Sequence, residues 1–254
     1  MSTTNSKVAI ITGATGGIGL EIAKRLGQDG FTVIVNGRQE DKGSEAIKEL
    51  KASGITAHYR NFDVTDEAAV TDHVTAVGKE FGKIDVLVNN AGGLGGRSRF
   101  EEMTTEFYRK VLALNLDSVF FASRAAIPFL KKGDHPTIIN VTSNAAWNAG
   151  GPGAGMYGTS KAGVQTITRA LAKDLAEYGI RVNAVSPGTI DTPFHHQIKS
   201  TKPEVFKSWA NNIMLGRLGQ PEDVAGVVSF LASKDAAFMT AETVQVGGGQ
   251  ALGI

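Results

Sequence analysis

The chain has 254 residues, of which 42% are hydrophobic and 20% charged, and its formal net charge at pH 7 is +1. This balance provides no broad basic surface for nucleic acid, and the absence of cysteine excludes disulfides and thiolate metal sites. The polar N-terminus and the lack of a long uncharged apolar run predict a cytoplasmic protein with no membrane partner.

The first apolar run ends in a glycine turn of the kind that binds anions. Lys7–Thr12 is predicted to be a buried strand, Leu20–Gln28 is predicted to be a helix, and Gly13-Ala14-Thr15-Gly16-Gly17-Ile18-Gly19 joins them. Free backbone N–H groups and the positive end of the helix dipole favour a pyrophosphate at such a junction. The spacing Gly-x-x-x-Gly-x-Gly differs from the commoner Gly-x-Gly-x-x-Gly fingerprint, so a plain tight turn remains the alternative.

A guanidinium follows the second predicted strand, Phe31–Asn36. NAD-binding folds usually carry a carboxylate about 20 residues past the glycine turn, for the ribose hydroxyls. In this sequence that place holds Gly37, followed by Arg38. Arginine can bind a 2′-phosphate through two hydrogen bonds, which predicts a preference for NADP(H). The alternative is that Arg38 only caps a loop and that NAD(H) is also used.

Strands and helices then alternate to the end of the chain. Further strands are predicted at Ile55–Asn61, Ile84–Val88, Pro136–Thr142, Ile180–Val185 and Thr243–Val246. Helices are predicted at Asp41–Ser53, Asp66–Phe81, Thr105–Lys110, Val111–Lys131, Tyr157–Tyr178 and Pro221–Ala232, with a mobile helical lid over the substrate at 189–214. Seven strands in this order predict one doubly wound, mostly parallel α/β domain over residues 1–254, with its ligand at the carboxyl ends of the strands.

Several polar residues stand where these strands end. Asp63 could bond an adenine amino group or cap a turn, and we weigh the two equally. The amides and small residues of Asn89-Asn90-Ala91-Gly92-Gly93 suit a wall beside an adenosine ribose. Asn115 lies inside a helical pattern, where it is either a local distortion or a polar group placed under the site. The adjacent His195 and His196 project about 100° apart on a helix, so they would chelate a metal poorly and are interpreted as lid surface.

Tyr157 and Lys161 are the residues around which we expect the chemistry to be organised. Positions four apart on a helix lie on one face, about 6 Å apart along the axis. A phenol titrates near pH ~10, and a nearby cation favours the phenolate, which makes the group useful for proton transfer. Taken alone, a Tyr-x-x-x-Lys pair is common on helices and could be an ordinary half-exposed pair.

Five motifs together resemble the short-chain dehydrogenase/reductase family. They are TGATGGIG at 12–19, NNAG at 89–92, Ser143, YGTSK at 157–161 and SPG at 186–188, and they cover essentially the whole chain. The resemblance implies that Tyr157 is the general acid for a carbonyl oxygen and that Ser143 hydrogen-bonds that oxygen. It also implies that Lys161 lowers the tyrosine pKa and holds the nicotinamide ribose, and that Asn115 supports a water-mediated proton relay through Lys161.

The same resemblance implies the contacts of a nicotinamide dinucleotide and no metal. With Tyr157 and Lys161, these contacts are Gly13, Thr15, Gly17, Ile18, Gly19, Arg38, Asp63, Val64, Asn89, Ala91, Gly92, Pro187, Gly188, Ile190 and Thr192. Two departures stand out. Ser143 and Tyr157 are one residue further apart than in many relatives, which predicts an insertion within 144–156. Gly16 stands where relatives that use NADP often have a basic residue.

The substrate is predicted with less support from the motifs. A polar and partly basic set should border the site: Arg97, Arg99, Trp147, Asn148, His195, His196 and Lys199. This set suggests a polar or anionic oxo compound, such as an oxo sugar acid, a keto acid or a 3-oxoacyl thioester, unless the charges are only a solvated rim.

Three further expectations concern role and assembly. A 3-oxoacyl-[acyl-carrier-protein] reductase is the alternative enzyme, although Tyr178 occupies the position where such relatives often have a basic docking residue before the glycine that matches Gly179. A dinucleotide-binding regulator without turnover is the alternative from another class. Family resemblance implies a homotetramer built partly on helices 111–131 and 157–178.

Overall fold

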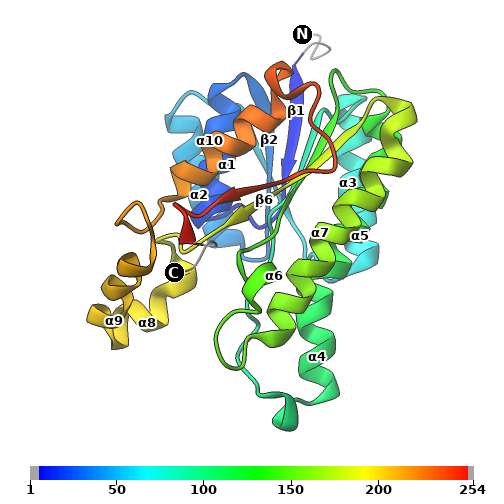
Figure 1. Ribbon diagram of the computed structural model, residues 1–254. Helices are drawn as coiled ribbons and strands as arrows, with labels where there is room; N and C mark the ends of the chain where they lie inside the picture. Colours follow the sequence, from blue (N-terminus) through cyan, green and yellow to red (C-terminus); the bar gives the residue numbers. More distant parts are fainter. Residues whose placement is uncertain (1–5, 251–254) are drawn as a thin grey trace.

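Seven parallel strands form one sheet in the computed structural model, which describes residues 6–250 (Figure 1). They are β1 (Lys7–Ile11), β2 (Phe31–Gly37), β3 (Ala57–Asn61), β4 (Val86–Asn89), β5 (Thr137–Val141), β6 (Arg181–Pro187) and β7 (Thr243–Val246). The spatial order is β3-β2-β1-β4-β5-β6-β7, and every neighbouring pair is parallel. This confirms the predicted doubly wound α/β fold. The order reverses between β1 and β4, which opens a crevice at the carboxyl ends of the strands.

Helices cover both faces of the sheet because β1 is apolar on both sides. Ala9 and Ile11 point to one face and Val8 and Ile10 to the other, as successive strand residues do. The first face packs against α1 (Gly17–Gln28), α2 (Glu40–Ala52) and α10 (Pro221–Ala232). The second packs against α3 (Glu67–Phe81), α5 (Ser118–Leu130) and α7 (Gly155–Leu175). Two apolar layers therefore hold the sheet rigid beneath the crevice.

One long helical segment replaces the two helices predicted at Thr105–Lys110 and Val111–Lys131. It runs as α4 (Thr105–Leu112), a π-helical turn (Ala113–Asp117) and α5. By length and composition alone, Thr105–Leu130 could cross a membrane, which the sequence analysis did not anticipate. Such a signal is weak, since core helices of soluble proteins also produce it; here Val119, Ala122, Ala126 and Leu130 are buried in the fold.

The observed ends of several strands and helices differ from the predicted ends by one to three residues. The strands predicted from Ile55 and Ile84 begin two residues later, because the backbone N–H groups of Ile55 and Ile84 donate to helix carbonyls instead of joining the sheet. Helix α7 begins at Gly155 and ends at Leu175, and the 3-10 turn Ala176–Tyr178 follows it.

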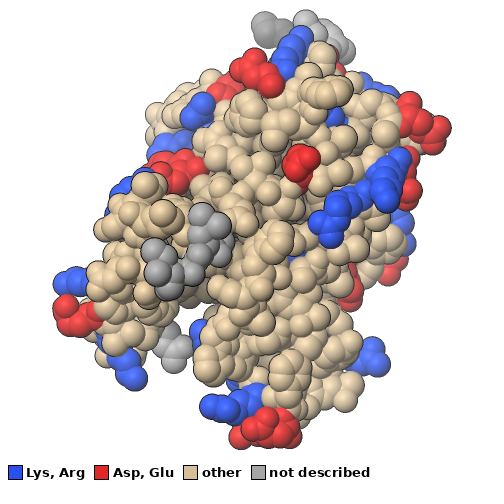
Figure 2. All heavy atoms as spheres, viewed as in Figure 1, with Lys and Arg blue, Asp and Glu red and all other residues tan. Residues whose placement is uncertain are grey.

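Short helices occupy the remaining connections. The segment 189–214 is helical as predicted, with η4 (Pro193–His195), α8 (His196–Thr201), α9 (Pro203–Ser208) and η5 (Trp209–Asn212). The others are η1 (Phe100–Glu102), α6 (Ala145–Asn148) and η6 (Lys234–Ala236). Viewed from the side of β7 and α7, the centre of the surface is largely uncharged, while charged side chains of both signs gather toward the periphery (Figure 2).

Candidate active site

A cavity of about 910 Å³ lies at the carboxyl ends of the central strands. Gly13 follows β1, Asn90 follows β4, Thr142 follows β5 and Gly188 follows β6, and all four line it. Most of the predicted cofactor contacts also line it, namely Gly13, Thr15, Gly17, Ile18, Gly19, Arg38, Val64, Ala91, Gly92, Tyr157, Lys161, Pro187, Gly188, Ile190 and Thr192. The topology thus gathers residues from widely separated motifs around one space.

The glycine turn leaves the start of α1 open to this cavity. Gly13 and Gly17 have φ values of 61° and 56°, a backbone region that favours glycine. A Cβ on Gly13 would lie 2.8 Å from the Ala91 Cα, so the turn also requires a residue without a side chain. No side chain caps the N-terminus of α1, which leaves backbone N–H groups free to bind a ligand. This geometry fits the pyrophosphate of a dinucleotide.

Asp63 does not line the cavity, and its carboxylate serves the turn. It accepts hydrogen bonds from the Thr65 backbone N–H at 2.9 Å and the Thr65 hydroxyl at 2.8 Å, and it pairs with the Arg38 guanidinium at 3.3 Å. Partial burial acts to raise the pKa of Asp63, but the Thr65 hydrogen bonds and Arg38 together lower it. Of the two roles weighed for Asp63, the structure favours the turn cap.

Asn89 was predicted as a cofactor contact, and the structure corrects this. Its side chain is buried between β5 and α5, where the amide nitrogen donates to Asn140 and Ser123. The next residue, Asn90, lines the cavity and donates to the backbone carbonyls of Thr12 and Gly13, both at 2.9 Å. Side chains alternate along an extended backbone, so adjacent asparagines must face opposite sides.

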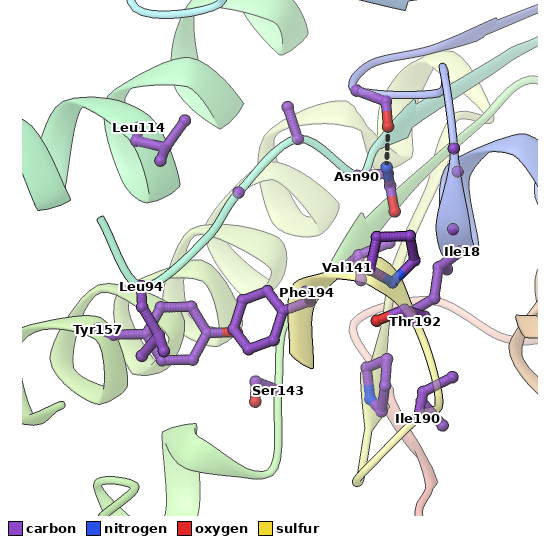
Figure 3. A pocket seen from close by; sticks show the side chains of 18 of the residues that line it. Ile18, Asn90, Leu94, Leu114, Val141, Ser143, Tyr157, Ile190, Thr192 and Phe194 are labelled. Atoms are coloured by element: carbon purple, nitrogen blue, oxygen red, sulfur yellow. Dashed lines mark hydrogen bonds between the residues drawn. The ribbon is translucent and has the colours of Figure 1, made fainter. Parts of the chain in front are cut away.

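The Ser143 and Tyr157 side chains lie near each other in the cavity (Figure 3). The Lys161 ammonium lies 6.0 Å from the centre of the Tyr157 ring and donates to the Val141 carbonyl at 2.8 Å. Its side chain lines the same cavity but is almost fully buried. The predicted trio therefore lines the same cavity as the glycine turn.

Asn115 lies behind the cavity wall. The sequence allowed either a local helix distortion or a polar group placed under the site, and the structure shows features of both. It sits in the π-helical turn, where its amide nitrogen donates to the Val111 carbonyl, so the helix is locally distorted. The same amide also exchanges two hydrogen bonds with the backbone of Gly93, each 2.9 Å long. A Cβ on Gly92 would lie 2.8 Å from Asn115 Oδ1 and 2.9 Å from Lys161 Nζ, so both polar groups converge on this glycine.

The electrostatics differ from the prediction that Lys161 lowers the pKa of Tyr157. Burial raises the pKa of Tyr157, and the hydrogen bond with Ser143 opposes this without reversing it. Burial lowers the pKa of Lys161 to about 8. Spacing on a helix gives proximity but no measure of desolvation, and here burial is the largest cause of both pKa shifts.

Apolar side chains lie beside Tyr157 in the cavity. Leu94 and Phe194 are next to it, and the ring centres of Tyr157 and Phe194 are 6.3 Å apart, while Leu114 lines the cavity farther away (Figure 3). Of the polar residues predicted at the border, Arg97 and His195 line the cavity, whereas Arg99, Trp147, Asn148, His196 and Lys199 do not. His195 is not the lid surface predicted for it; its ring packs 5.5 Å from Phe206 and 5.4 Å from Trp209.

A phosphate cradle and a tyrosine that can donate a proton share one crevice, which is typical of oxidoreductases that use a nicotinamide cofactor. A family model described as Enoyl-(Acyl carrier protein) reductase matches residues 13–251. The chain belongs to the short-chain dehydrogenase/reductase family, as its motifs indicated.

Similar proteins span the full chain. One relative is the (S)-acetoin-forming diacetyl reductase of Staphylococcus aureus. The two chains are 39% identical over 255 residues, which cover 97% of this chain and 98% of the relative. This chain is also 36% identical over 249 residues to a cyclopentanol dehydrogenase from Comamonas testosteroni, covering 98% of each. A variant of actinorhodin polyketide ketoreductase with NADPH aligns with a TM-score of 0.92 at 36% identity, covering 99% of each chain. The protein is therefore an NAD(P)-dependent oxidoreductase that acts on carbonyl or hydroxyl groups.

Proposed function

We propose that this protein catalyses reversible, NADP(H)-linked reduction of an oxo substrate, with Tyr157 as the proton donor. The observation that carries this proposal is that Ser143, Tyr157 and buried Lys161 line the cavity that also holds the glycine turn. The nicotinamide, when bound, supplies the hydride that the carbonyl carbon receives. The Tyr157 hydroxyl gives its proton to the carbonyl oxygen, and Ser143 hydrogen-bonds that oxygen to hold it in place.

Lys161 would return the proton to Tyr157. Its pKa of about 8 lets the amine exchange a proton near neutral pH, which a lysine in water does poorly. Asn115 Oδ1 converges on Gly92 together with Lys161 Nζ, which supports the relay role implied for Asn115.

Replacing Tyr157 with phenylalanine tests the assignment. We expect kcat to fall by about 10²–10⁴-fold, the usual contribution of a general acid, while the cofactor still binds. Turnover that survives the change would reject the role. If the wild-type protein binds cofactor tightly and turns over no carbonyl, the alternative of a dinucleotide-binding regulator would replace the proposal.

The preference for NADP(H) rests on two cations. Arg38 and Lys42 both line the cavity beyond β2, and Lys42 was missed in the sequence because it belongs to the next helix. Asp63 pairs with Arg38 and Glu45 also lines this end, so a 2′-phosphate must compete with carboxylates. We expect kcat/KM to favour NADPH over NADH, and Arg38→Ala to reduce that ratio about tenfold. A wild-type preference for NADH would overturn the proposed NADP(H) preference, and NAD(H) would then be the cofactor that the enzyme uses.

The proposed substrate has an apolar reacting end and a polar or anionic far end. Leu94 and Phe194 suit the first, and Arg97 suits the second. Arg97 donates one hydrogen bond from Nη1 to the Pro152 carbonyl, and the guanidinium group has further N–H donors for a carboxylate. Matched ketones with and without a carboxylate, assayed with the wild type and Arg97→Gln, test this. Equal rates on both ketones would refute the anionic end.

A 3-oxoacyl-[acyl-carrier-protein] reductase remains the alternative, for which one contact provides specific support. The Lys131 ammonium lies 3.4 Å from the centre of the Tyr178 ring, which places a cation beside the position where such relatives often have one. An assay with acyl-carrier-protein thioesters and with free thioesters would separate the two, because a docking cation should favour only the former.

We also propose a cytoplasmic homotetramer in which 189–214 closes over the substrate. Phe120 and Tyr178 are exposed large side chains on or beside α5 and α7, the helices expected at the interface. The largely uncharged face over β7 and α7 is also suited to self-association (Figure 2). Light scattering tests the assembly; a monomer at micromolar concentration would refute it.

A further inference from the structure

His195 lines the cavity, and aromatic rings hold its side chain there. Its ring centre lies 4.9 Å from that of Phe194, 5.5 Å from that of Phe206 and 5.4 Å from that of Trp209. These contacts fix the half-buried imidazole by packing. Within residues 6–250, neither ring nitrogen has a hydrogen-bonding partner from the protein. The cavity is therefore the place where a polar ligand can reach them.

The charges around His195 favour an anion. Arg97 lines the cavity from the loop after β4, and its charge acts on the imidazole. Lys199 is a second cation that acts on the ring, whereas Asp191 is a carboxylate that does so and is itself paired with Lys199. Two cations and one carboxylate leave these surroundings positive, so this part of the cavity suits a carboxylate better than a cationic group.

We propose that His195 is a specificity-determining residue that binds the carboxylate of the substrate together with Arg97. The guanidinium supplies a fixed charge, and an imidazole N–H donates a further hydrogen bond to the same carboxylate. This inference rests on the proposed function, because it takes the substrate to be a carbonyl compound, and it narrows that substrate to an oxo acid. A neutral ketone of the same length would lack both contacts.

The imidazole also makes binding of the carboxylate depend on pH. Burial is the largest cause that lowers the pKa of His195 from its ordinary 6.5, so the ring is neutral at pH 7.5 and gains its proton in weak acid. Protonation turns a neutral hydrogen bond into a charge-assisted one, so the carboxylate should bind more tightly as the pH falls. The other charged or titratable side chains around the ring and the cavity beside it are Asp191, Lys199, Arg97, Glu204, Lys207, Tyr157 and Lys161.

The ratio of two KM values isolates the contribution of His195. Levulinate and its longer homologues are methyl ketones that end in a carboxylate, and methyl ketones of the same chain length are their neutral counterparts. Titration of Tyr157 or Lys161 affects both ketones, so it cancels in the ratio of the carboxylate KM to the neutral KM. For the wild type we expect this ratio to fall about fivefold from pH 7.5 to pH 5, the difference between a neutral and a charge-assisted hydrogen bond.

Two substitutions separate the hydrogen bond from the charge. His195→Gln keeps a neutral N–H donor that does not titrate, so the ratio should match the wild type within about twofold at pH 7.5 and should not change with pH. His195→Phe keeps an aromatic ring and removes the donor, so the ratio should rise about fivefold at pH 7.5. His196→Gln is the control, because His196 is exposed and does not line the cavity. A wild-type ratio that is independent of pH, or a His195→Gln ratio that still falls, would overturn the proposal.

Histidine NMR tests the same contact without turnover and without His195→Phe, should that variant not fold. With NADP⁺ bound the ketone is not reduced, and His195→Gln identifies one ¹³Cε1 signal among the five histidines. A carboxylate favours the protonated ring, so saturating levulinate or a homologue should raise the His195 midpoint by about 0.7 pH unit, which corresponds to fivefold, and the neutral ketone should not. A midpoint that no carboxylate moves would refute the proposal. A wild type that reduces neither ketone would defeat the proposed function and leave the NMR outcome to decide this one.

Discussion

Replacing Lys161 with methionine should stabilise the protein at neutral pH while abolishing turnover. Lys161 is only 3% exposed, and burial lowers its pKa to about 8. Methionine has a side chain of similar length and no charge, so it can occupy the buried space of the Lys161 side chain without the desolvation cost of an ammonium. A functional group retained at such a cost is a common form of trade-off between stability and activity.

The magnitude follows from the same pKa. A fall from the usual 10.5 to about 8, at about 1.4 kcal/mol per pH unit, disfavours the buried ammonium by roughly 3 kcal/mol. Losing the hydrogen bond to the Val141 carbonyl offsets about 1 kcal/mol, which leaves a net gain of about 2 kcal/mol for the variant at pH 7.

The sign of the pH dependence provides a second check. Because the folded pKa of Lys161 lies below the unfolded value, the unfolded chain binds more protons between about pH 8 and 10.5. The wild type therefore gains stability as the pH rises through this window. The advantage of Lys161→Met should be full below pH 8 and, above about pH 10.5, should reverse to a disadvantage of about 1 kcal/mol, because the neutral amine still donates to the Val141 carbonyl.

Urea unfolding of both proteins at pH 7 and pH 10, without cofactor, measures this difference. Lys173→Met is the matched control, because Lys173 is exposed on the same helix α7 and its loss should change little. If Lys161→Met is less stable than the wild type at pH 7, or if the difference does not narrow at pH 10, burial is not the dominant cost at this lysine.

Two further changes test other parts of the fold. Gly92→Ala would push a methyl group against the Lys161 amine, so we expect kcat/KM to fall about 10- to 100-fold. The control is Gly93→Ala, whose new methyl group would lie 3.9 Å from its nearest atom, an ordinary contact distance. Its kcat/KM should fall less than about threefold. Arg217 lowers the pKa of Asp223 to about 2, so this carboxylate stabilises the fold above about pH 4 and loses that effect as the pH falls toward 2. Arg217→Gln should therefore be less stable than the wild type at pH 5, with the difference closing by pH 2 in acid unfolding curves.

The fold could be predicted because its signals are local. Each buried strand is a short apolar run, and helices follow the strands at regular intervals. The glycine turn between the first strand and the first helix indicates where a dinucleotide would bind. Gly13 and Gly17 adopt the positive φ values that such a turn requires. The ends of the elements were less predictable, since the backbone N–H of Ile55 or Ile84 pairs with a helix only after the helix has packed on the sheet.

The errors at the site have a different origin. Choosing Asn89 over Asn90 required knowing which face of the strand end looks into the cavity, and two adjacent asparagines carry no such signal. Lys42 lies at the cavity because α2 leaves β2 at a particular angle.

The Tyr157 and Lys161 pair shows how far spacing alone can be taken. Four residues along a helix brought the two side chains to one cavity, as predicted, but the same spacing is compatible with either direction of pKa shift. The direction was decided by the burial of both groups, which raises the pKa of Tyr157 and lowers the pKa of Lys161. The proposed proton relay therefore draws on the lowered pKa of Lys161, whereas the spacing of the two residues predicted only their shared place in the cavity.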